Sequence, residues 1–285
     1  MLNLYAKSIL GPHNRVNLYR GCVHNCIYCD SRSDVYKVTN FENIGVKDNA
    51  MEIFEKELSK KRKRSMIVTG SMCDPYLPIE RDLKLTRKML EIISKFRFGV
   101  SLLTKSDLIL RDIDLIEKIN QQFGALVCMT VTTYNDDLCL QIERNVIPTS
   151  LRFACLEQFV KRGIPTGIWM GPILPFINDN EDNITRIVNR CAEIGIKYIV
   201  VFEFGTTKRS GSEQYFYKCL DNFFPGLKQK YINTYGNQYN CISPNASKLW
   251  EIFKNLCAKH NIIYDLNQIM NQFKQQKDYE QLTII

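Results

Sequence analysis

Apolar and polar positions change in blocks along the first 205 residues, and these blocks predict strands that alternate with helices. Short apolar runs have the composition of strands that are buried on both faces of a parallel sheet. Between them, apolar residues recur three and four positions apart, as they do on one face of a helix. Strands are expected at 15–19, 65–69, 100–104, 125–131, 165–170 and 197–202. Helices are expected between them at 49–62, 82–96, 111–121, 149–162 and 180–193.

Residue types at the ends of the predicted helices agree with this division. Thr149 can cap the start of one helix, and Asn180 or Asp182 can cap another. Gly163 and Gly195 follow the expected ends of the same two helices, where glycine is common. The alternation therefore has plausible start and stop residues as well as the right periodicity.

Strands that alternate with helices predict the α/β class, with a parallel sheet and crossover helices. A partial (β/α)6 barrel fits this pattern, and a doubly wound open sheet is the alternative. In both architectures the ligand site lies at the carboxyl ends of the strands. The polar residues that follow each predicted strand are therefore the candidates for a functional site.

The pattern changes after residue 206, and the rest of the chain predicts a helical extension. Helices are expected at 211–220, 247–260 and 264–275, around a stretch that is rich in tyrosine and asparagine. We expect a barrel over residues 1–206 and a C-terminal helical extension over 207–285 that packs on it. Within the extension, one set of tyrosines recurs every four residues, which predicts a core-facing helical stripe, with base stacking as the alternative. This set is Tyr231, Tyr235 and Tyr239.

Composition is that of an ordinary globular protein, with 45% hydrophobic and 24% charged residues among 285. No run approaches the ~20 apolar residues of a membrane helix, and the N-terminus lacks a secretory pattern, so we expect a cytoplasmic protein without a membrane partner. The net charge of +8 permits a nucleic-acid partner without requiring one. The densest basic run, residues 60–64, is expected at a helix end, where the helix dipole favours cations.

Three of the eleven cysteines, Cys22, Cys26 and Cys29, follow the spacing C-x3-C-x2-C. One short loop with this spacing can direct three thiolates to one point. A cubane [4Fe–4S] cluster normally takes four ligands, so three thiolates leave one iron open. Zinc with His24 as a further ligand is an alternative, as are three buried free thiols. The other cysteines are scattered and are expected to be small buried residues: Cys73, Cys128, Cys139, Cys155, Cys191, Cys219, Cys241 and Cys257.

The cysteine spacing, with the aromatic Tyr28 just before the third cysteine, resembles the signature of radical S-adenosylmethionine (SAM) enzymes. In that superfamily the open iron binds the amino and carboxylate groups of SAM, and an electron from the cluster cleaves SAM to a 5′-deoxyadenosyl radical. The resemblance implies a [4Fe–4S] cluster and SAM as cofactors and a partial barrel as the fold. It also implies an external electron donor of the flavodoxin or ferredoxin type.

Later stretches are similar to the spore photoproduct lyase-like group, whose members are often labelled DNA-repair photolyases. The similar stretches are 69–80, 85–87, 104–106, 110–114 and 171–175, with further matches at Thr130 to Thr133, Ile142, Glu143, Arg152 and Gly163. Together they span about residues 14–205. The resemblance implies a lyase or another radical transformation, and DNA repair as one context. Asp30 departs from the pattern, because relatives carry an aromatic residue after the third cysteine.

The resemblance also implies roles for single residues. Cys22, Cys26 and Cys29 would ligate the cluster. The residues that would contact SAM are Tyr28, Gly70, Ser71, Lys105, Thr130, Thr132 and Arg152. Among them, Gly70 and Ser71 would hold the amino group, Lys105 and Arg152 would meet carboxylates, and the threonines would meet the ribose or methionine. Each of these residues also has a structural alternative. Gly70 and Ser71 could form a plain turn, Lys105 could be a surface lysine, the two threonines could be core residues, and Arg152 could form a surface ion pair.

Cys73 is the candidate for a catalytic residue beyond the motif. Spore photoproduct lyase has a hydrogen-donating cysteine in the corresponding loop, and a thiol within reach can quench a substrate radical. In this chain Cys73 falls one position before Asp74, which is the aspartate that the resemblance aligns, so the register is inexact. A packed small residue is the alternative for Cys73.

These observations leave two hypotheses for function. The first is a radical SAM enzyme that abstracts hydrogen from an unidentified substrate, with a DNA photolesion, a peptide or a small metabolite as candidates. The second is a non-enzymatic iron–sulfur or zinc protein that binds nucleic acid. Metal analysis distinguishes them, because one zinc without iron or sulfide would favour the second.

Overall fold

A six-stranded parallel sheet forms the centre of the protein, of which the computed structural model describes residues 2–275. The strand order is β2-β5-β6-β7-β8-β9, and every neighbouring pair is parallel. The strands are β2 (Arg15–Val16), β5 (Met66–Thr69), β6 (Gly99–Thr104), β7 (Ala125–Thr130), β8 (Thr166–Trp169) and β9 (Tyr198–Val200). In the described residues β2 and β9 do not pair, so the sheet is open. The predicted partial barrel of the α/β class is confirmed.

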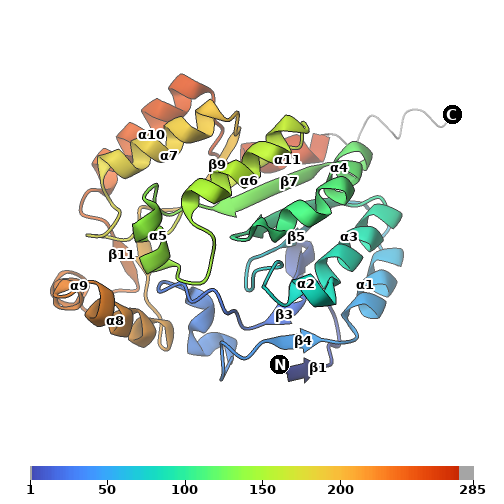
Figure 1. Cartoon of the computed structure of the whole chain (residues 1–285), viewed down its shortest axis with the longest axis horizontal. Coiled ribbons are helices and arrows are strands. Elements are labelled where there is room, and N and C mark those ends of the chain that lie inside the picture. The colour runs from blue at the N-terminus through green and yellow to red at the C-terminus, as the bar shows by residue number, and fades with distance from the viewer. Residues whose placement is uncertain (1, 276–285) are drawn as a thin grey trace.

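Crossover helices cover one face of this sheet, as the alternation predicts (Figure 1). They are α1 (Ala50–Ser59), α3 (Leu85–Lys95), α4 (Ile113–Gln122), α6 (Thr149–Lys161) and α7 (Glu181–Glu193). Val127 and Met129 of β7 pack in the main core on this side. Leu126 and Cys128 of the same strand point the other way.

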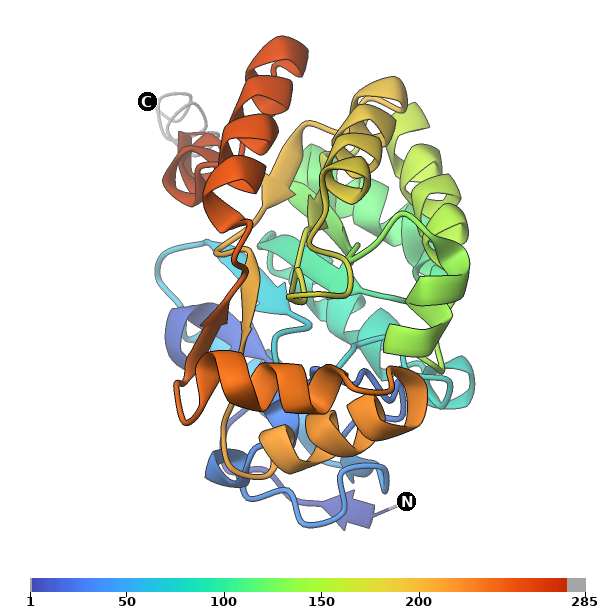
Figure 2. The same ribbon diagram turned by 90° about the vertical axis from the view of Figure 1, so that its left-hand side faces the viewer.

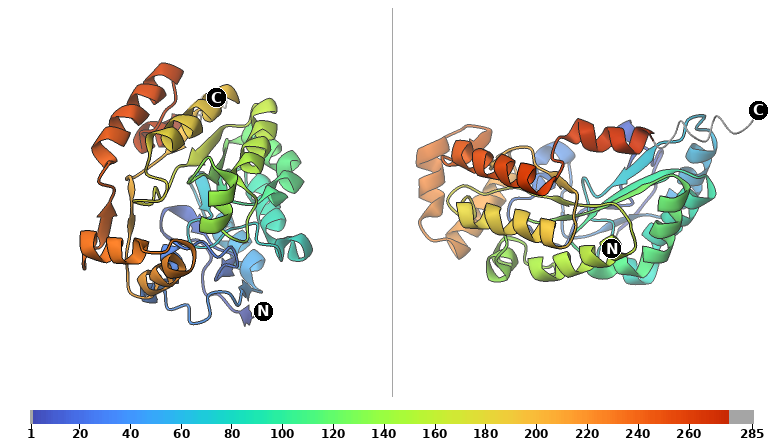
Figure 3. Two further views of the ribbon diagram at one scale, coloured as in Figure 1. Left: turned by 60° about the vertical axis from the view of Figure 1, so that its left-hand side comes forward. Right: turned by 90° about the horizontal axis from the view of Figure 1, so that it is seen from above.

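The opposite face of the sheet is partly covered by α11 (Leu266–Gln275), which Figure 3 shows on the side away from α4 and α6. Ile269 and Phe273 of this helix form a separate apolar cluster with Leu126 and Tyr198 of the sheet. Both faces of β7 are therefore buried, which explains why its sequence is a continuous apolar run.

The expected strand over 15–19 is divided between two sheets, which corrects that prediction. Its first residues form β2, whereas Tyr19 and Arg20 form β3 (Tyr19–Arg20) and pair with β4 (Gly45–Lys47) in a small sheet with β1 (Leu2–Leu4). Strands of two or three residues show no hydrophobic period, so the sequence did not predict this sheet. The basic run 60–64 is exposed, follows the end of α1 and lies at the amino end of β5.

The predicted helix ends are correct for α7 and partly correct for α6. Asn180 caps α7, because its side-chain oxygen accepts a hydrogen bond from the backbone N–H of Asn183 at 2.9 Å. Thr149 is not a cap, because α6 is capped by Pro148 and the Thr149 hydroxyl donates to the Thr133 carbonyl at 2.7 Å. Beyond the two helices, Gly163 and Gly195 have φ values of 69° and 82°.

The C-terminal extension contains two strands as well as helices. Its elements are β10 (Gly205–Thr207), α8 (Ser212–Phe223), α9 (Leu227–Tyr235), β11 (Asn240–Ile242), α10 (Ala246–His260) and α11. β10 pairs with β11, and α10 packs on α7. Residue 1 and residues 276–285, where the expected extension ends, lie outside the described part. Within residues 2–275, no helix combines the length and the apolar character that crossing a bilayer requires.

The extension also packs on the loop that carries the three motif cysteines (Figure 2). Ile27 of that loop shares a second apolar core with Phe216 of α8 and Tyr231 of α9. Tyr231 and Tyr235 are buried, as the predicted stripe requires, but Tyr239 lies beyond the end of α9 and is 43% exposed. The cysteine loop therefore packs against α8 and α9, which lie about 200 residues later in the chain.

Gly70 ends β5 and is required there by a close backbone contact. It has a φ of +91°, and a Cβ at this position would lie 2.1 Å from the Leu103 carbonyl oxygen in β6. We expect Gly70→Ala to lower the free energy of unfolding by about 3 kcal/mol or more, because strain and overlap add. Gly163→Ala is the matched control, since Gly163 also has a positive φ but an added Cβ there would meet no atom of the described residues within 4 Å, and it should cost about 1 kcal/mol. Urea denaturation measures both, and equal losses would contradict the contact.

Candidate functional site

The three motif cysteines lie on one loop between β3 and the 3-10 helix Asp30–Arg32. Cys26 is buried, whereas Cys22 and Cys29 are partly exposed. Two backbone hydrogen bonds anchor the loop: Cys22 N–H donates to the Phe41 carbonyl at 2.8 Å, and Ile27 N–H donates to the Ile142 carbonyl at 2.9 Å. The loop is thus fixed from two sides before any ligand binds.

Cys73 lies directly against this loop. Its thiol is buried and donates to the Gly21 carbonyl at 2.8 Å. The same thiol also lies beside Cys22, and this contact holds the pKa of the Cys22 thiol well below its usual range, against the effect of burial. The fold therefore places the candidate catalytic cysteine at the motif loop itself.

A buried histidine and carboxylate connect the cysteine loop to the ends of β5 and β6. His24 Nδ1 lies 3.5 Å from Asp74 Oδ2. Asp74 also accepts hydrogen bonds from the Thr104 hydroxyl at 2.6 Å and from the Lys105 N–H at 2.8 Å. Burial acts to lower the pKa of the His24 imidazole, but Asp74 and Cys22 outweigh it and raise that pKa. His24 thus turns toward Asp74 from the middle of the motif.

Four polar side chains form a buried charge network on the other side of the loop. Arg152 Nη1 lies 2.5 Å from Glu143 Oε2, and both side chains are fully buried. Lys105 Nζ lies 3.9 Å from Glu143 Oε1, to which the Tyr28 hydroxyl also donates. Burial acts to raise the pKa of the Glu143 carboxyl, but Arg152 and Lys105 outweigh it and lower that pKa. Two cations share one carboxylate here, so the network carries a positive excess.

Lys105 is the cation of this network that keeps partial access to solvent. Its side chain is 17% exposed, and its ammonium lies 6.0 Å from the centre of the Tyr28 ring. Burial acts to lower the pKa of this ammonium, but Cys26 and Glu143 outweigh it and hold the pKa above its usual value. Lys105 is therefore positioned to present a fixed charge next to the cysteine loop, and it is not a simple surface lysine.

The remaining predicted SAM contacts occupy different environments. Ser71 is exposed at the end of β5. Thr130 and Thr132 are buried at the end of β7, and the Thr132 hydroxyl has no hydrogen-bond partner among the described residues. Arg152 has its donors engaged by Glu143, by the Thr130 and Ile147 carbonyls and by the Cys139 sulfur. A surface ion pair is thereby excluded for Arg152.

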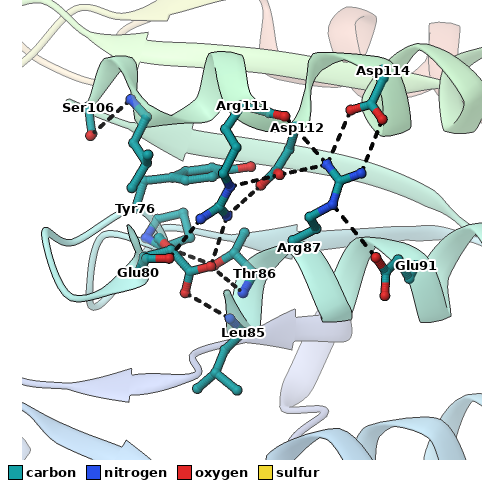
Figure 4. A network of polar contacts seen from close by, with 12 residues as sticks. Tyr76, Glu80, Leu85, Thr86, Arg87, Glu91, Ser106, Arg111, Asp112 and Asp114 are labelled. Carbon is teal, nitrogen blue, oxygen red and sulfur yellow. Dashed lines mark hydrogen bonds and ion pairs between the residues drawn. The ribbon is translucent and has the colours of Figure 1, made fainter. Parts of the chain in front are cut away.

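The stretch that follows β5 is held by a network of ion pairs, shown in Figure 4. Glu80 is buried and accepts hydrogen bonds from the backbone N–H groups of Leu85 and Thr86 at 3.1 and 2.9 Å. Arg111 bridges Glu80 and the buried Asp112 at 3.0 and 2.8 Å. These residues carry much of the resemblance quoted above, and here they are structural, because they fix the loop that contains Ser71, Cys73 and Asp74.

Sequence reasoning did not identify several residues of this site. Asp74 and Glu143 lie within stretches that were recognised, yet no role followed for them from the sequence. Asp74 follows the predicted strand over 65–69, which is the signal that could have found it, whereas Glu143 follows α5 (Asp136–Ile142), a helix that the sequence did not predict. Arg32 had no signal at all, because its contacts come from residues far away along the chain.

The chemistry of the loop fits an iron–sulfur cluster. The three motif thiols interact electrostatically with one another, and two buried polar atoms of the segment that follows them, Arg32 Nε and Ser33 Oγ, have no hydrogen-bond partner among the described residues. Donors left without an acceptor beside three thiolates suit a group that brings further acceptor sulfurs. No three His, Cys, Asp or Glu side chains in residues 2–275 are arranged to hold a single metal ion. The residues that would hold the cluster are Cys22, Cys26 and Cys29.

Two uncharacterised proteins are similar to this chain in sequence. An uncharacterised protein of Methanocaldococcus jannaschii is 34% identical over 177 residues, which cover 61% of this chain and 65% of that protein. An uncharacterised protein of Mycobacterium tuberculosis is 26% identical over 227 residues, which cover 77% of this chain and 66% of that protein. The chain thus spans just under two thirds of the length of these relatives.

A solved structure of spore photoproduct lyase complexed with dinucleoside spore photoproduct has the same fold. Its TM-score is 0.66 at 13% sequence identity, and the match covers 90% of this chain and 78% of that one. The sequence pattern described as the Radical SAM superfamily matches residues 16–205, from β2 to the start of β10. Because this match covers well over half of the sequence, the chain belongs to the radical SAM superfamily.

Proposed function

We propose that this protein is a radical SAM enzyme that cleaves SAM at a [4Fe–4S] cluster and abstracts hydrogen from a substrate. When bound, the cluster and SAM supply the 5′-deoxyadenosyl radical. The observation that carries the proposal is that Cys22, Cys26 and Cys29 share one loop beside the partly exposed ammonium of Lys105, whose charge acts on Cys26 and Cys29. A loop that offers three thiolates next to one fixed cation suits a cluster with one open iron and a ligand that carries a carboxylate.

Each residue of the site then has a proposed task. Lys105 pairs with the carboxylate of SAM, and Tyr28, whose ring lies beside that ammonium, borders the ligand. Gly70, Ser71, Thr130 and Thr132 keep the roles that the family resemblance implies. Cys73 is the candidate hydrogen donor.

For Arg152 we propose an indirect role. Its donors are engaged within the protein, and its ion pair with Glu143 holds the carboxylate to which both Tyr28 and Lys105 are bound. Arg152 therefore acts as a positioning residue behind the SAM site.

The division into a barrel over residues 1–206 and an extension over 207–285 stays a prediction.

A DNA photolesion is our first candidate substrate, because the solved relative is complexed with dinucleoside spore photoproduct. A peptide or a small metabolite remains an alternative substrate, and the electron donor is proposed to be an external flavodoxin or ferredoxin. The exposed basic run 60–64 does not favour a nucleic acid at the site, because it lies at the amino end of β5, whereas the cysteines lie at the carboxyl end.

Reconstitution tests the proposal directly. The protein is loaded anaerobically with iron and sulfide, its metal and sulfide content is measured, and it is incubated with SAM and dithionite. We expect about four irons per chain and 5′-deoxyadenosine that forms only when the reductant is present. A fully loaded protein that leaves SAM intact would sink the proposal. One zinc without iron or sulfide would favour the non-enzymatic alternative.

The role of Lys105 can be tested by its affinity for SAM. We expect Lys105→Met to weaken SAM binding to the loaded protein about tenfold or more, because a charge-assisted contact with a carboxylate is lost. Equilibrium dialysis with labelled SAM measures this without turnover. Lys95→Met is the matched control, since Lys95 pairs with Glu55 at 2.6 Å but is 64% exposed on α3. Unchanged affinity in the Lys105 variant would assign this lysine a purely structural role.

A further inference from the structure

The segment that follows the third cysteine, residues 30–36, is held in place by the C-terminal extension. The Asp34 backbone N–H donates to the Ser210 carbonyl at 2.9 Å, and the Ser210 hydroxyl donates to Asp34 Oδ2 at 2.5 Å. Gly211 has a φ of +87°, and a Cβ there would lie 3.0 Å from the Arg32 carbonyl oxygen. The extension therefore approaches this segment at backbone distance.

Within this segment, the side chain of Arg32 is nearly buried and is held by two aromatic rings and two hydrogen bonds. Its side chain is 10% exposed, and its guanidinium carbon lies 4.5 Å from the centre of the Phe41 ring and 3.8 Å from that of Tyr215 in α8. Nη2 donates to Asn25 Oδ1 at 2.6 Å and to Glu42 Oε1 at 3.1 Å. Two rings and two acceptors thus fix the plane of the guanidinium, and Asn25 belongs to the cysteine loop itself.

The Nε–H of the same guanidinium is buried and has no hydrogen-bond partner within residues 2–275. Because a buried donor that is left unpaired is destabilising, an acceptor is expected opposite it. The backbone N–H of Arg32 donates to the Cys29 carbonyl at 3.2 Å, which places the residue one turn beyond the third cysteine. Ser33, the next residue, also has a buried hydroxyl that finds no partner in the described part of the chain. The acceptors that such donors meet beside an iron–sulfur cluster are thiolate and sulfide sulfurs.

We propose that Arg32 is a positioning residue of the cluster, which directs its Nε–H to the sulfurs at the Cys29 corner and is held there by Tyr215. This inference rests on the proposed function, in that the cysteine loop must carry a cluster. Because Tyr215 belongs to α8, the C-terminal extension would then contribute directly to the cluster site. Hydrogen bonds and charge near the sulfurs raise the reduction potential of such clusters, so Arg32 makes the cluster easier to reduce.

The test is the midpoint potential of the cluster, measured by redox titration with EPR detection on the reconstituted full chain. For Arg32→Gln we expect a more negative potential, such that the ratio of reduced to oxidised cluster at the wild-type midpoint falls about tenfold. Arg32→Lys keeps the charge but loses the planar fork, and should shift the potential in the same direction by less. Tyr215→Leu should give a smaller shift of the same sign, whereas Tyr215→Phe, which keeps the ring, should retain the wild-type value.

Arg144→Gln is the matched control. Arg144 is an exposed arginine that donates to the Tyr215 hydroxyl at 2.8 Å, so its replacement removes a nearby positive charge but leaves the ring of Tyr215 and the side chain of Arg32 in place. Its potential should equal that of the wild type. A wild-type protein that accepts no cluster would end the proposed function before this question arises. A loaded Arg32→Gln protein with unchanged potential and EPR spectrum would overturn the inference, as would an equal shift in the Arg144 variant. If the glutamine variant does not fold, a wild-type potential in Arg32→Lys overturns it.

Discussion

Replacing Glu143 with alanine is expected to lower the free energy of unfolding by about 3–5 kcal/mol, because the buried charge of Arg152 is left without its counter-ion. The guanidinium and the carboxylate are both fully buried and lie 2.5 Å apart, so solvent cannot replace the lost partner. Lys105 loses its counter-ion as well, and the Tyr28 hydroxyl loses its acceptor. Chemical denaturation of the unloaded protein measures the loss separately from any effect of the cluster.

The control for this experiment is an ion pair of the same type on the surface. Glu193 accepts from Arg190 Nη1 at 3.0 Å, but its side chain is 62% exposed. Glu193→Ala should change stability by about 0.5 kcal/mol or less, as exposed pairs do. A Glu143 variant that is no less stable than the Glu193 variant would mean that the buried network is not formed in solution.

Replacing any one of Cys22, Cys26 and Cys29 with alanine is expected to abolish cleavage of SAM and to remove most of the bound iron. A cubane with two protein ligands loses a corner that the protein alone supplies, so no partial activity is expected. Cys128→Ala is the control, since Cys128 is a buried thiol in β7 that packs on the apolar face covered by α11. Iron, sulfide and 5′-deoxyadenosine are measured on the same reconstituted samples.

Replacing Cys73 tests whether this cysteine, which lies beside Cys22, is a cluster ligand or only a neighbour of the cysteine loop. Its thiol donates to the Gly21 carbonyl at 2.8 Å, so Cys73 lies close enough to the loop to be mistaken for a ligand. We expect Cys73→Ala to retain full iron and sulfide content, because the open corner of the cluster is reserved for SAM. Loss of iron in this variant would identify a fourth protein ligand and would contradict an open iron.

The sheet was predictable because its cause is local. Strands buried on both faces give continuous apolar runs, and five of the six expected strands lie within a few residues of β5 to β9. The small sheet and α5 (Asp136–Ile142) were missed because they are too short to show a period. α5 also begins with two aspartates after Asn135, so its start looks like a polar loop.

The cysteine loop was predictable for the same reason, since its three thiols are close in the sequence. Its surroundings were not predictable, because they come from distant positions. Tyr28 and Glu143 are 115 residues apart, and nothing local to either one indicates the other. The stack of Tyr215 on Arg32 is likewise a result of packing between the extension and the loop. Pattern analysis therefore gave the candidate ligands but not the residues that surround and orient their loop.

The contact between Asp34 and Ser210 joins positions that are 176 residues apart, and this separation has a consequence for how the protein is made. During synthesis the ribosome releases the cysteines early, whereas the α8 residues that pack on their loop are not added until about three quarters of the chain has been translated. Until then the motif loop lacks the cover that the extension gives it in the folded chain, where Cys26 is buried and Cys22 and Cys29 keep partial access to solvent. Under the proposed function, a cluster can therefore enter the nascent chain past fewer residues than it must pass in the folded protein.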